Sequence, residues 1–129
     1  MKVYIAASNR ELARGWAKHL EAEGYTITSR WLYDGQWKPP DYDDAGRCRG
    51  ALDDHEDVKD CDVLILQEGD YRTCHGGKYV EMGIALALDK PCFVIGERGN
   101  IFHWHSMVKM VPNFDVLVPE LKAYERKRI

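Results

Sequence analysis

The sequence predicts an α/β fold in which helices cover both faces of a parallel β-sheet. Short apolar runs, such as residues 62–66 (DVLIL) and 92–96 (CFVIG), alternate along the chain with longer segments of helical character. Continuous apolar runs of this length are typical of strands that are covered on both faces. Strands that alternate with helices indicate parallel strands joined by helical crossovers, which places helices on both sides of the sheet.

The first strand and helix are predicted at the start of the chain. Residues 2–7 (KVYIAA) form a short β-prone run, and Ser8-Asn9 after it can cap a helix that extends to about Glu23. Gly24 stands where the C-terminal cap of that helix belongs. The apolar face of this helix is expected to consist of Leu12, Trp16 and Leu20.

The middle of the chain predicts a second strand, a loop and a polar helix. Residues 25–32 (YTITSRWL) are β-prone, whereas a glycine and a proline pair prevent regular structure in residues 33–44. Residues 45–60 are polar and have helical character, and we expect Leu52 and Val58 to face inward.

The second half of the chain predicts a helix, a long loop and two alternatives for the last strand. Residues 77–88 form a run of small and apolar residues that predicts a helix, and residues 97–106 predict the loop. Residues 107–111 (MVKMV) and 114–118 (FDVLV) compete as the last strand, and we favour the first. Pro119 either begins or kinks the final helix.

These elements predict a three-layer flavodoxin- or Rossmann-like fold with about five parallel strands. Residues 1–129 contain no repeat and no linker-like tract, so we expect one domain. In such sheets, ligands bind beyond the carboxyl ends of the strands, near the point where the strand order reverses. The loops after Ala7, Leu66 and Gly96 should therefore form the site.

The composition argues against several classes of function. The formal net charge of −3 argues against general binding to nucleic acid polymers or anionic membranes. The longest apolar run is far shorter than the roughly 20 residues of a membrane span. Met1-Lys2 leads directly into a strand, so we expect no signal peptide and a cytoplasmic location.

A metal site has two possible sources in the sequence, and neither is complete. The four cysteines form no CxxC pair, so we expect free thiols at Cys48, Cys61, Cys74 and Cys92. His103 and His105 would share one face of a strand and could bind a metal, but no third ligand lies at a useful spacing. We therefore expect no metal.

Two carboxylates are candidates for chemistry. Glu81 follows Gly76-Gly77 in HGGKYVE, where glycines let the backbone approach a ligand and the helix N-terminus can bind an anion or a sugar hydroxyl. The helix dipole alone would also favour a glutamate in a first turn. Asp54 lies in DDHED, which could be a solvated acidic face. The pattern by itself leaves both alternatives open for each carboxylate.

Further candidates follow from the predicted ends of the strands. Tyr4 would pack in the core unless its hydroxyl emerges at the active end of the sheet, and Arg10 is either a surface cation or a phosphate ligand. The other polar residues of the three predicted site loops are Ser8 and Asn9, then Arg72, His75 and Lys78, and then Arg98, Asn100 and His103.

Together these motifs resemble the nucleoside 2-deoxyribosyltransferase superfamily over nearly the whole chain. VYIAASNR is similar to the opening strand and loop of the family, and DHEDVKDCDVLIL to the segment in which an aspartate stands eight residues before the start of the third strand. GGKYVEMGIALALDKPCFVIG is the most specific match, since the nucleophile helix of the family also carries a glutamate-x-glycine pair. GNIFHWHSMV is similar to the asparagine–phenylalanine loop of many small members.

The resemblance implies a role for the matched residues. Glu81 matches the nucleophile, Asp54 the acid or base, and Tyr4 the hydroxyl that positions the nucleophile. Ser8 and Arg10 match a serine and an arginine of members that act on nucleoside 5'-monophosphates. We expect the remaining contacts to substrate or phosphate from Asn9, His75, Gly76, Gly77, Lys78, Asn100 and His103.

His75 is the main departure from the family pattern. Six residues before the nucleophile, members that act on free nucleosides carry an aspartate, and the monophosphate hydrolases carry a serine. A histidine near Lys78 suits a phosphate better than a bare hydroxyl, so we favour a nucleotide substrate. The family generally forms dimers in which a late loop completes the site of the neighbouring subunit, and Asn100 and His103 would serve that purpose here.

The implied reaction is cleavage of the N-glycosidic bond of a nucleoside or, as we favour, a (2'-deoxy)nucleoside 5'-monophosphate. Glu81 would form a covalent glycosyl-enzyme, and Asp54 would protonate the leaving base. Transfer of the sugar to water makes a hydrolase and transfer to a nucleobase makes a transferase, and neither needs a cofactor. Trp31, Trp37 and Tyr42 could stack on the base or could belong to the core or an interface.

Two alternatives remain at the level of the sequence. A cytokinin-activating nucleotide phosphoribohydrolase also uses a Gly-Gly loop and a glutamate, but its longer PGGxGT loop is absent here. A non-catalytic nucleotide sensor would keep the pocket without turnover, and the presence of both Glu81 and Asp54 argues against it.

Overall fold

The computed structural model describes residues 1–34, 43–69 and 76–128, and within these ranges five parallel strands form one sheet in the order β2-β1-β3-β4-β5. This arrangement confirms the predicted α/β fold and is the flavodoxin-like strand order. The strands are β1 (Lys2–Ala6), β2 (Thr26–Ile27), β3 (Val63–Gln67), β4 (Cys92–Ile95) and β5 (Val108–Val111). The α-helices are α1 (Arg10–Ala22), α2 (Asp44–Asp60), α3 (Gly77–Ala87) and α4 (Phe114–Arg128), and the short 3-10 helices are η1 (Arg30–Leu32) and η3 (Ile101–Trp104).

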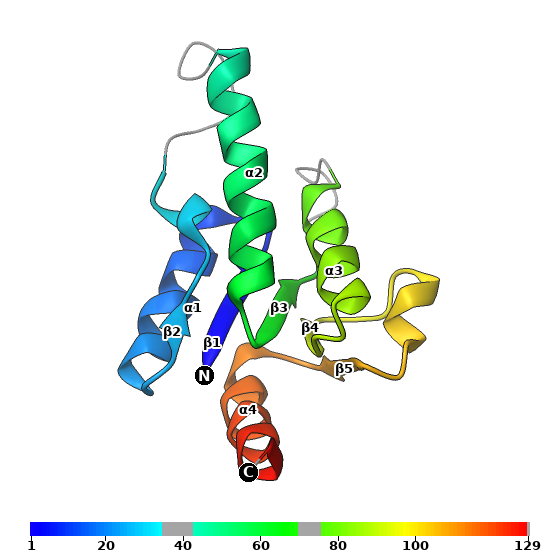
Figure 1. Ribbon diagram of the computed structural model, residues 1–129. Coiled ribbons are helices and arrows are strands. Elements are labelled where there is room, and N and C mark those ends of the chain that lie inside the picture. The colour runs from blue at the N-terminus through cyan, green and yellow to red at the C-terminus, as the bar shows by residue number, and fades with distance from the viewer. Residues whose placement is uncertain (35–42, 70–75, 129) are drawn as a thin grey trace.

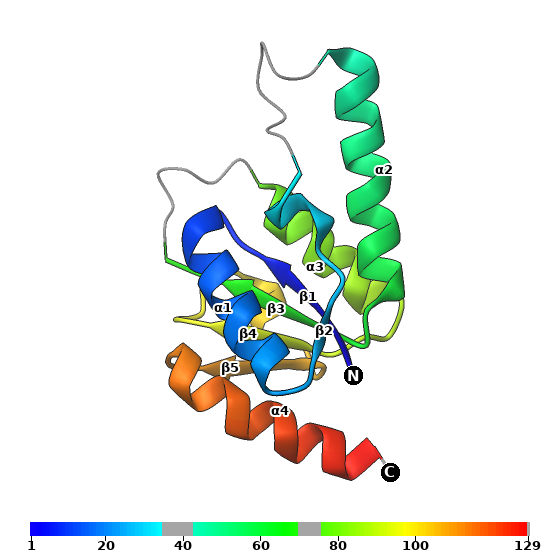
Figure 2. The ribbon, with the colours of Figure 1, turned by 90° about the vertical axis from the view of Figure 1, so that its left-hand side faces the viewer.

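The helices cover the two faces of the sheet in pairs (Figures 1 and 2). The face under α1 and α4 includes the helical residues Ala13, Ala17, Leu20, Leu117 and Leu121, and the face under α2 and α3 includes Val58, Met82 and Ala85. Alternate residues of β1 point to opposite faces, so that Val3 and Ile5 lie in the first cluster and Tyr4 and Ala6 in the second. Tyr4 therefore lies on the same face as α2 and α3.

The strand order reverses between β1 and β3. These strands are neighbours, with Tyr4 opposite Leu64 and Ala6 opposite Leu66. The helix α1, which follows β1, covers one face of the sheet, and α3, which follows β3, covers the other. Connections that diverge in this way open a crevice beyond the carboxyl ends of the two strands, where ligands of such folds bind.

Several predicted boundaries are confirmed. The Asn9 side chain caps α1 by accepting a hydrogen bond from Leu12 N at 3.0 Å, and Gly24 follows the helix with a φ of 97°. The favoured last strand is β5, whereas the alternative strand at residues 114–118 is wrong, because this segment forms the first turns of α4. Pro119 lies inside α4 rather than at its start.

The second strand is much shorter than predicted. Of residues 25–32, only Thr26–Ile27 pair with β1, and the segment ends in η1. The hydroxyl of Ser29 accepts a hydrogen bond from a backbone N–H of β1 at 2.8 Å, which replaces a backbone pairing. The backbone N–H of Arg30 donates to the carboxylate of Asp57 on α2 at 3.0 Å. These contacts draw the chain off the sheet edge and towards α2.

Two residues predicted to face inward are exposed. Leu12 on α1 is 41% exposed and Leu52 on α2 is 60% exposed, whereas Val58 is buried as predicted. Leu52 comes six residues before Val58 on α2, about 240° around the helix, so the two side chains point to different sides. In the described part of the chain, no helix combines the length and apolar character that a membrane span requires.

Candidate active site

Tyr4 and Glu81 meet on the face of the sheet that α2 and α3 cover. Tyr4 is completely buried, and its hydroxyl donates a hydrogen bond to Glu81 Oε2. Because α3 begins at Gly77, Glu81 lies beyond the first helical turn, where the influence of the helix dipole has largely fallen off. The dipole therefore does not account for this carboxylate, and the structure brings together the two residues that the sequence assigns to nucleophile and positioning hydroxyl.

The surroundings of Glu81 favour its protonated form. Burial is the main cause that raises the pKa of Glu81 to about 8; the hydrogen bond from Tyr4 acts against this shift, and the charges of Asp54 and Asp57 add to it. Burial and the charge of Glu81 also raise the pKa of Tyr4 far above its usual range. Tyr4 therefore remains a phenol and a hydrogen-bond donor at any physiological pH.

Asp54 is the second carboxylate of the site. It lies on α2, which packs against α3, and it is partly buried. Burial raises the pKa of Asp54 to about 6, and the nearby charges of Asp57 and Asp53 add to the effect. The charge of Asp54 in turn raises the pKa values of Glu81 and Tyr4. The structure thus places all three predicted catalytic residues within electrostatic reach of one another.

The first loop has structural roles, of which the sequence predicts the cap at Asn9 but not the hydrogen bonds of Arg10. Asn9 uses its side-chain oxygen to cap α1. The guanidinium group of Arg10 donates hydrogen bonds to the carbonyl oxygens of Trp31 and Asp34, with 3.1 Å between Nε and the oxygen of Trp31. Ser8 lies partly buried between β1 and α1, at the carboxyl end of the strand. Arg10 therefore fastens the segment after β2 to the start of α1.

Lys78 lies inside the protein rather than at the mouth of the site. Its side chain is 2% exposed, and Nζ donates to the carbonyl oxygen of Gln67 at 2.9 Å. Nζ also lies 3.8 Å from Glu68 Oε1, and the hydroxyl of Tyr79 donates to the same oxygen at 2.7 Å. The buried ammonium group thus ties the start of α3 to the end of β3 in this geometry, and its contact with a phosphate stays a prediction.

Sequence reasoning missed Glu68, the partner of Lys78. Glu68 directly follows a buried strand, and this position in the sequence could have identified it as a residue at the edge of the site. Gly96 at the end of β4 makes room for it, because a Cβ on Gly96 would lie 2.8 Å from the Cβ of Glu68. Gly96 also has a φ of 130°, a conformation that side chains rarely adopt. The carboxyl ends of β3 and β4 can therefore lie side by side at the edge of the site.

The late loop forms η3, and its polar residues stabilise that helix. The side-chain oxygen of Asn100 accepts a hydrogen bond from Phe102 N at 2.9 Å, and Nδ1 of His103 accepts one from Gly99 N at 2.7 Å. His103 is completely buried in this conformation, and its contact with substrate in a neighbouring subunit stays a prediction. The apolar residues of η3 are exposed, namely Ile101, Phe102 and Trp104.

Some predicted residues lie outside the described ranges: His75, Arg72, Cys74, Trp37 and Tyr42. Gly76 is the N-cap residue of α3 and has a φ of 89°.

The remaining predictions concern Trp31, the cysteines and a metal site. Trp31 is held by packing against both core clusters and by a hydrogen bond from its Nε1 to the carbonyl oxygen of Ile5 at 2.8 Å. Cys48, Cys61 and Cys92 are free thiols as predicted. In the described part of the chain, no group of three or more His, Cys, Asp or Glu residues could hold a metal ion.

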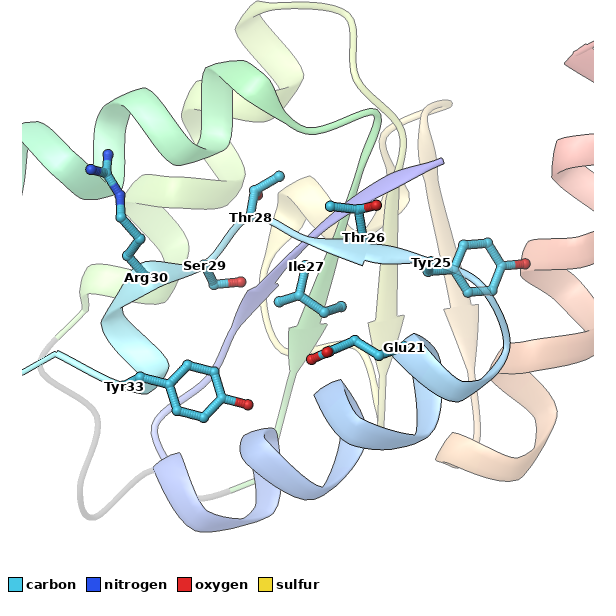
Figure 3. A pocket seen from close by; sticks show the side chains of 8 residues that line it. All are labelled: Glu21, Tyr25, Thr26, Ile27, Thr28, Ser29, Arg30 and Tyr33. Atoms are coloured by element: carbon cyan, nitrogen blue, oxygen red, sulfur yellow. The ribbon is translucent and has the colours of Figure 1, made fainter.

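A cavity of about 510 Å³ lies beside β2 (Figure 3). Its lining consists of Glu21, Tyr25, Thr26, Ile27, Thr28, Ser29, Arg30 and Tyr33. None of Tyr4, Asp54 and Glu81 belongs to this lining. The cavity is therefore distinct from the site predicted from the sequence.

Solved structures with the same fold include proteins of different function. The chain is similar to the CMP N-glycosidase BcmB of Clostridium botulinum, with 18% identity and a TM-score of 0.61 over 96% of this chain and 100% of the other. It is also similar to the 2-deoxyribosyltransferase of Bacillus psychrosaccharolyticus, with 22% identity and a TM-score of 0.70 over 91% and 90% of the two chains. A third similar structure is the receiver domain of the hybrid histidine kinase CckA, with 13% identity and a TM-score of 0.56 over 95% and 97%.

No protein-family model matches the chain, and no curated protein matches it either. At these identities the structural likeness establishes the fold, which two enzymes share with a receiver domain. The function must therefore be argued from the site.

Proposed function

We propose that this chain is an enzyme of the nucleoside 2-deoxyribosyltransferase superfamily that cleaves the N-glycosidic bond of a nucleoside or nucleotide. The observation that carries the proposal is the hydrogen bond from buried Tyr4 to Glu81, with Asp54 in electrostatic reach of both. These residues occupy the places that the sequence resemblance assigns to a positioning hydroxyl, a nucleophile and an acid. The fold likeness to a CMP N-glycosidase and a 2-deoxyribosyltransferase supports the same class of reaction.

Glu81 is the nucleophile of the proposed reaction. Tyr4 binds Oε2, which leaves Oε1 as the oxygen that we assign to attack on the anomeric carbon. The bond from Oε1 to this carbon forms as the bond to the base nitrogen breaks, and the base leaves with the electron pair and a proton from Asp54. Water or a second nucleobase then attacks the glycosyl-enzyme and releases Glu81, while Asp54 takes up the proton of the attacking group.

The two carboxyl groups hold one proton between them near neutral pH. With pKa values of about 8 for Glu81 and about 6 for Asp54, the ligand-free site keeps that proton mainly on Glu81. The reaction requires the opposite distribution, with an ionised nucleophile and a protonated acid. Positive charge develops at the anomeric carbon as the glycosidic bond breaks and stabilises ionised Glu81, so the proposed mechanism places the proton on Asp54 as the reaction approaches this transition state.

The substrate that we favour is a (2'-deoxy)nucleoside 5'-monophosphate. Ser8 and Arg10 lie at the carboxyl end of β1, next to the crevice where the strand order reverses. The α3 helix begins at Gly77, directly after Gly76, and the N-terminus of a helix favours a negative charge. An anion would be stabilised by both features.

A substitution of Arg10 tests the phosphate contact. We expect Arg10→Ala to raise KM for a nucleoside 5'-monophosphate roughly tenfold or more, as expected from loss of a charge-assisted hydrogen bond, and to change KM for the free nucleoside much less. Steady-state kinetics with the two substrates would measure the difference.

Arg14→Ala is the matched control for this experiment. Arg14 lies one turn further along α1 and also donates a hydrogen bond to a carbonyl oxygen of the same segment, that of Leu32. If Arg10 only fastens this segment, the two variants will affect nucleoside and monophosphate alike. That outcome would remove the phosphate contact from the proposal.

The reaction class is tested by the products. The protein would be incubated with a panel of nucleosides and nucleotides, with and without a second nucleobase, and the products separated by chromatography. Free base with a sugar or sugar phosphate indicates hydrolysis, and a new nucleoside or nucleotide indicates transfer. Binding of a nucleotide without any product would contradict the enzyme and support a nucleotide sensor.

We also propose that the chain forms one domain, is cytoplasmic and acts as a homodimer. The exposed apolar side chains of η3 support a contact with a second copy, because clustered apolar groups of this kind mark interaction surfaces. The molar mass in solution, measured by light scattering, tests the dimer, and a monomer at micromolar concentration would contradict it.

A further inference from the structure

Asp57 is a buried carboxylate next to the candidate site, and the proposed reaction does not use it. It is 6% exposed and lies on α2, about one helical turn after Asp54. Its carboxylate accepts hydrogen bonds from the backbone N and from Nε of Arg30, each at 3.0 Å, and lies 2.9 Å from Nη2 of the same residue. Pairing of this kind stabilises a buried carboxylate.

Arg30 joins η1 to the part of α2 that carries Asp54. Figure 3 shows its side chain extending from the rim of the cavity towards α2. Besides Asp57, Nη2 lies 3.5 Å from Asp53 and 3.7 Å from Glu56. The hydroxyl of Thr28 adds a hydrogen bond of 2.9 Å to the carbonyl oxygen of Asp57. The segment before η1 is thereby fastened to the turn of α2 that follows Asp54.

We propose that the Asp57–Arg30 ion pair positions Asp54 and controls whether Asp54 holds a proton, a role that rests on the proposed function of Asp54 as the acid. The pair brings a negative and a positive charge to the same turn of α2, and both act on Asp54.

The two partners act on Asp54 with opposite signs. Among the described residues, the charged and titratable groups that act on Asp54 or respond to its charge include Asp53 and Asp57 of α2, Arg30 of η1, Asp34 after η1, Glu81 of α3 and Tyr4 of β1. Burial is the main cause of the raised pKa of Asp54; Asp57 is the strongest of the charges that add to it, and Arg30 lowers it. Asp57 therefore favours the protonated acid that the leaving base needs.

Because Asp57 and Arg30 shift the pKa of Asp54 in opposite directions, substitutions can show whether the ion pair controls the protonation of Asp54 or only holds α2 in place. Asp57→Asn and Arg30→Gln break the same ion pair, so a pair that only holds α2 in place predicts similar effects of both variants. If the charges matter, Asp57→Asn lowers the pKa of Asp54 and Arg30→Gln raises it. Arg30→Lys keeps the charge and should restore the behaviour of the wild type.

The experiment follows the carboxyl carbon of Asp54 by NMR during a pH titration of the ligand-free full chain. We expect Asp57→Asn to shift the titration of Asp54 downward and Arg30→Gln to shift it upward, each by roughly 0.5 unit or more, a threefold change in proton affinity. The corresponding limb of the pH profile of kcat/KM should move in the same directions.

Shifts in the same direction, or unchanged titrations in both variants, would overturn the proposal. If Asp57→Asn does not fold, as judged by circular dichroism, the comparison of Arg30→Gln with Arg30→Lys decides, because the side chain of Arg30 is 47% exposed. If Asp54 titrates at the same pH in Arg30→Gln and Arg30→Lys, the charge of Arg30 does not control the protonation of Asp54, and the proposal is rejected. The titration needs no substrate, so an inactive wild-type protein would refute the proposed function without affecting this result.

Discussion

Replacing Glu81 by glutamine will abolish the release of base from every nucleoside and nucleotide that the wild-type protein cleaves, with a loss in kcat of roughly 10⁴-fold or more. Glutamine has nearly the same shape, and its side-chain oxygen can still accept the hydrogen bond from Tyr4. It lacks the negative charge that stabilises the cationic transition state and cannot form the glycosyl-enzyme. The measurement is the initial rate of base release, followed by chromatography.

Two further variants make this result specific. Glu81→Ala removes shape and charge together and should be as inactive as Glu81→Gln. Glu120→Gln is the matched control, because Glu120 lies on α4, on the opposite face of the sheet, and pairs with Lys109 at the surface. Full activity in Glu81→Gln would remove the nucleophile from the proposed mechanism, whatever the control shows.

The same substitution will stabilise the ligand-free protein at high pH. Burial raises the pKa of Glu81 from its ordinary value of 4.5 to about 8, so between these values the folded state holds a proton that the unfolded state has lost. The contribution of Glu81 to folding stability is therefore fully present below pH 4.5 and is lost as the pH rises through about 8. Glutamine remains neutral throughout and avoids this loss.

We expect Glu81→Gln to be more stable than the wild type by about 2–4 kcal/mol at pH 9 and equally stable near pH 4.5, since each unit of pKa shift corresponds to about 1.4 kcal/mol and partial exposure reduces the full value. The measurement is urea denaturation of both proteins at the two pH values. Glu120→Gln should show no such gain at pH 9.

An equal difference between Glu81→Gln and wild type at both pH values would show that the site does not favour protonated Glu81. The higher stability expected of Glu81→Gln illustrates a general trade-off. A charged group that is buried for catalysis lowers the stability of the folded protein.

The sequence by itself determined the class of the fold and most of its elements. The runs that form β3 and β4 are continuously apolar, which is typical of strands covered on both faces. Such a run therefore predicts a central strand of the sheet. The ends of α1 at Asn9 and Gly24 are also predictable from the sequence, because the backbone geometry of helix ends favours particular residue types.

The contact between Tyr4 and Glu81 was predictable only through the family resemblance. The two residues are far apart in the sequence, and no local pattern of either one indicates the other. Their hydrogen bond depends on β1 and α3 coming together on one face of the sheet.

Other features were decided by the tertiary structure alone. The polar sequence of α2 does not show which side of that helix faces the sheet, and Leu52 is exposed because it lies on a different side from buried Val58. Likewise, the sequence shows that Lys78 and Arg30 are charged, but their partners Glu68 and Asp57 come from other elements. Charges act through space and burial is a property of the packed molecule, so the ion pairs and raised pKa values of this site exist only once the helices are seated on the sheet.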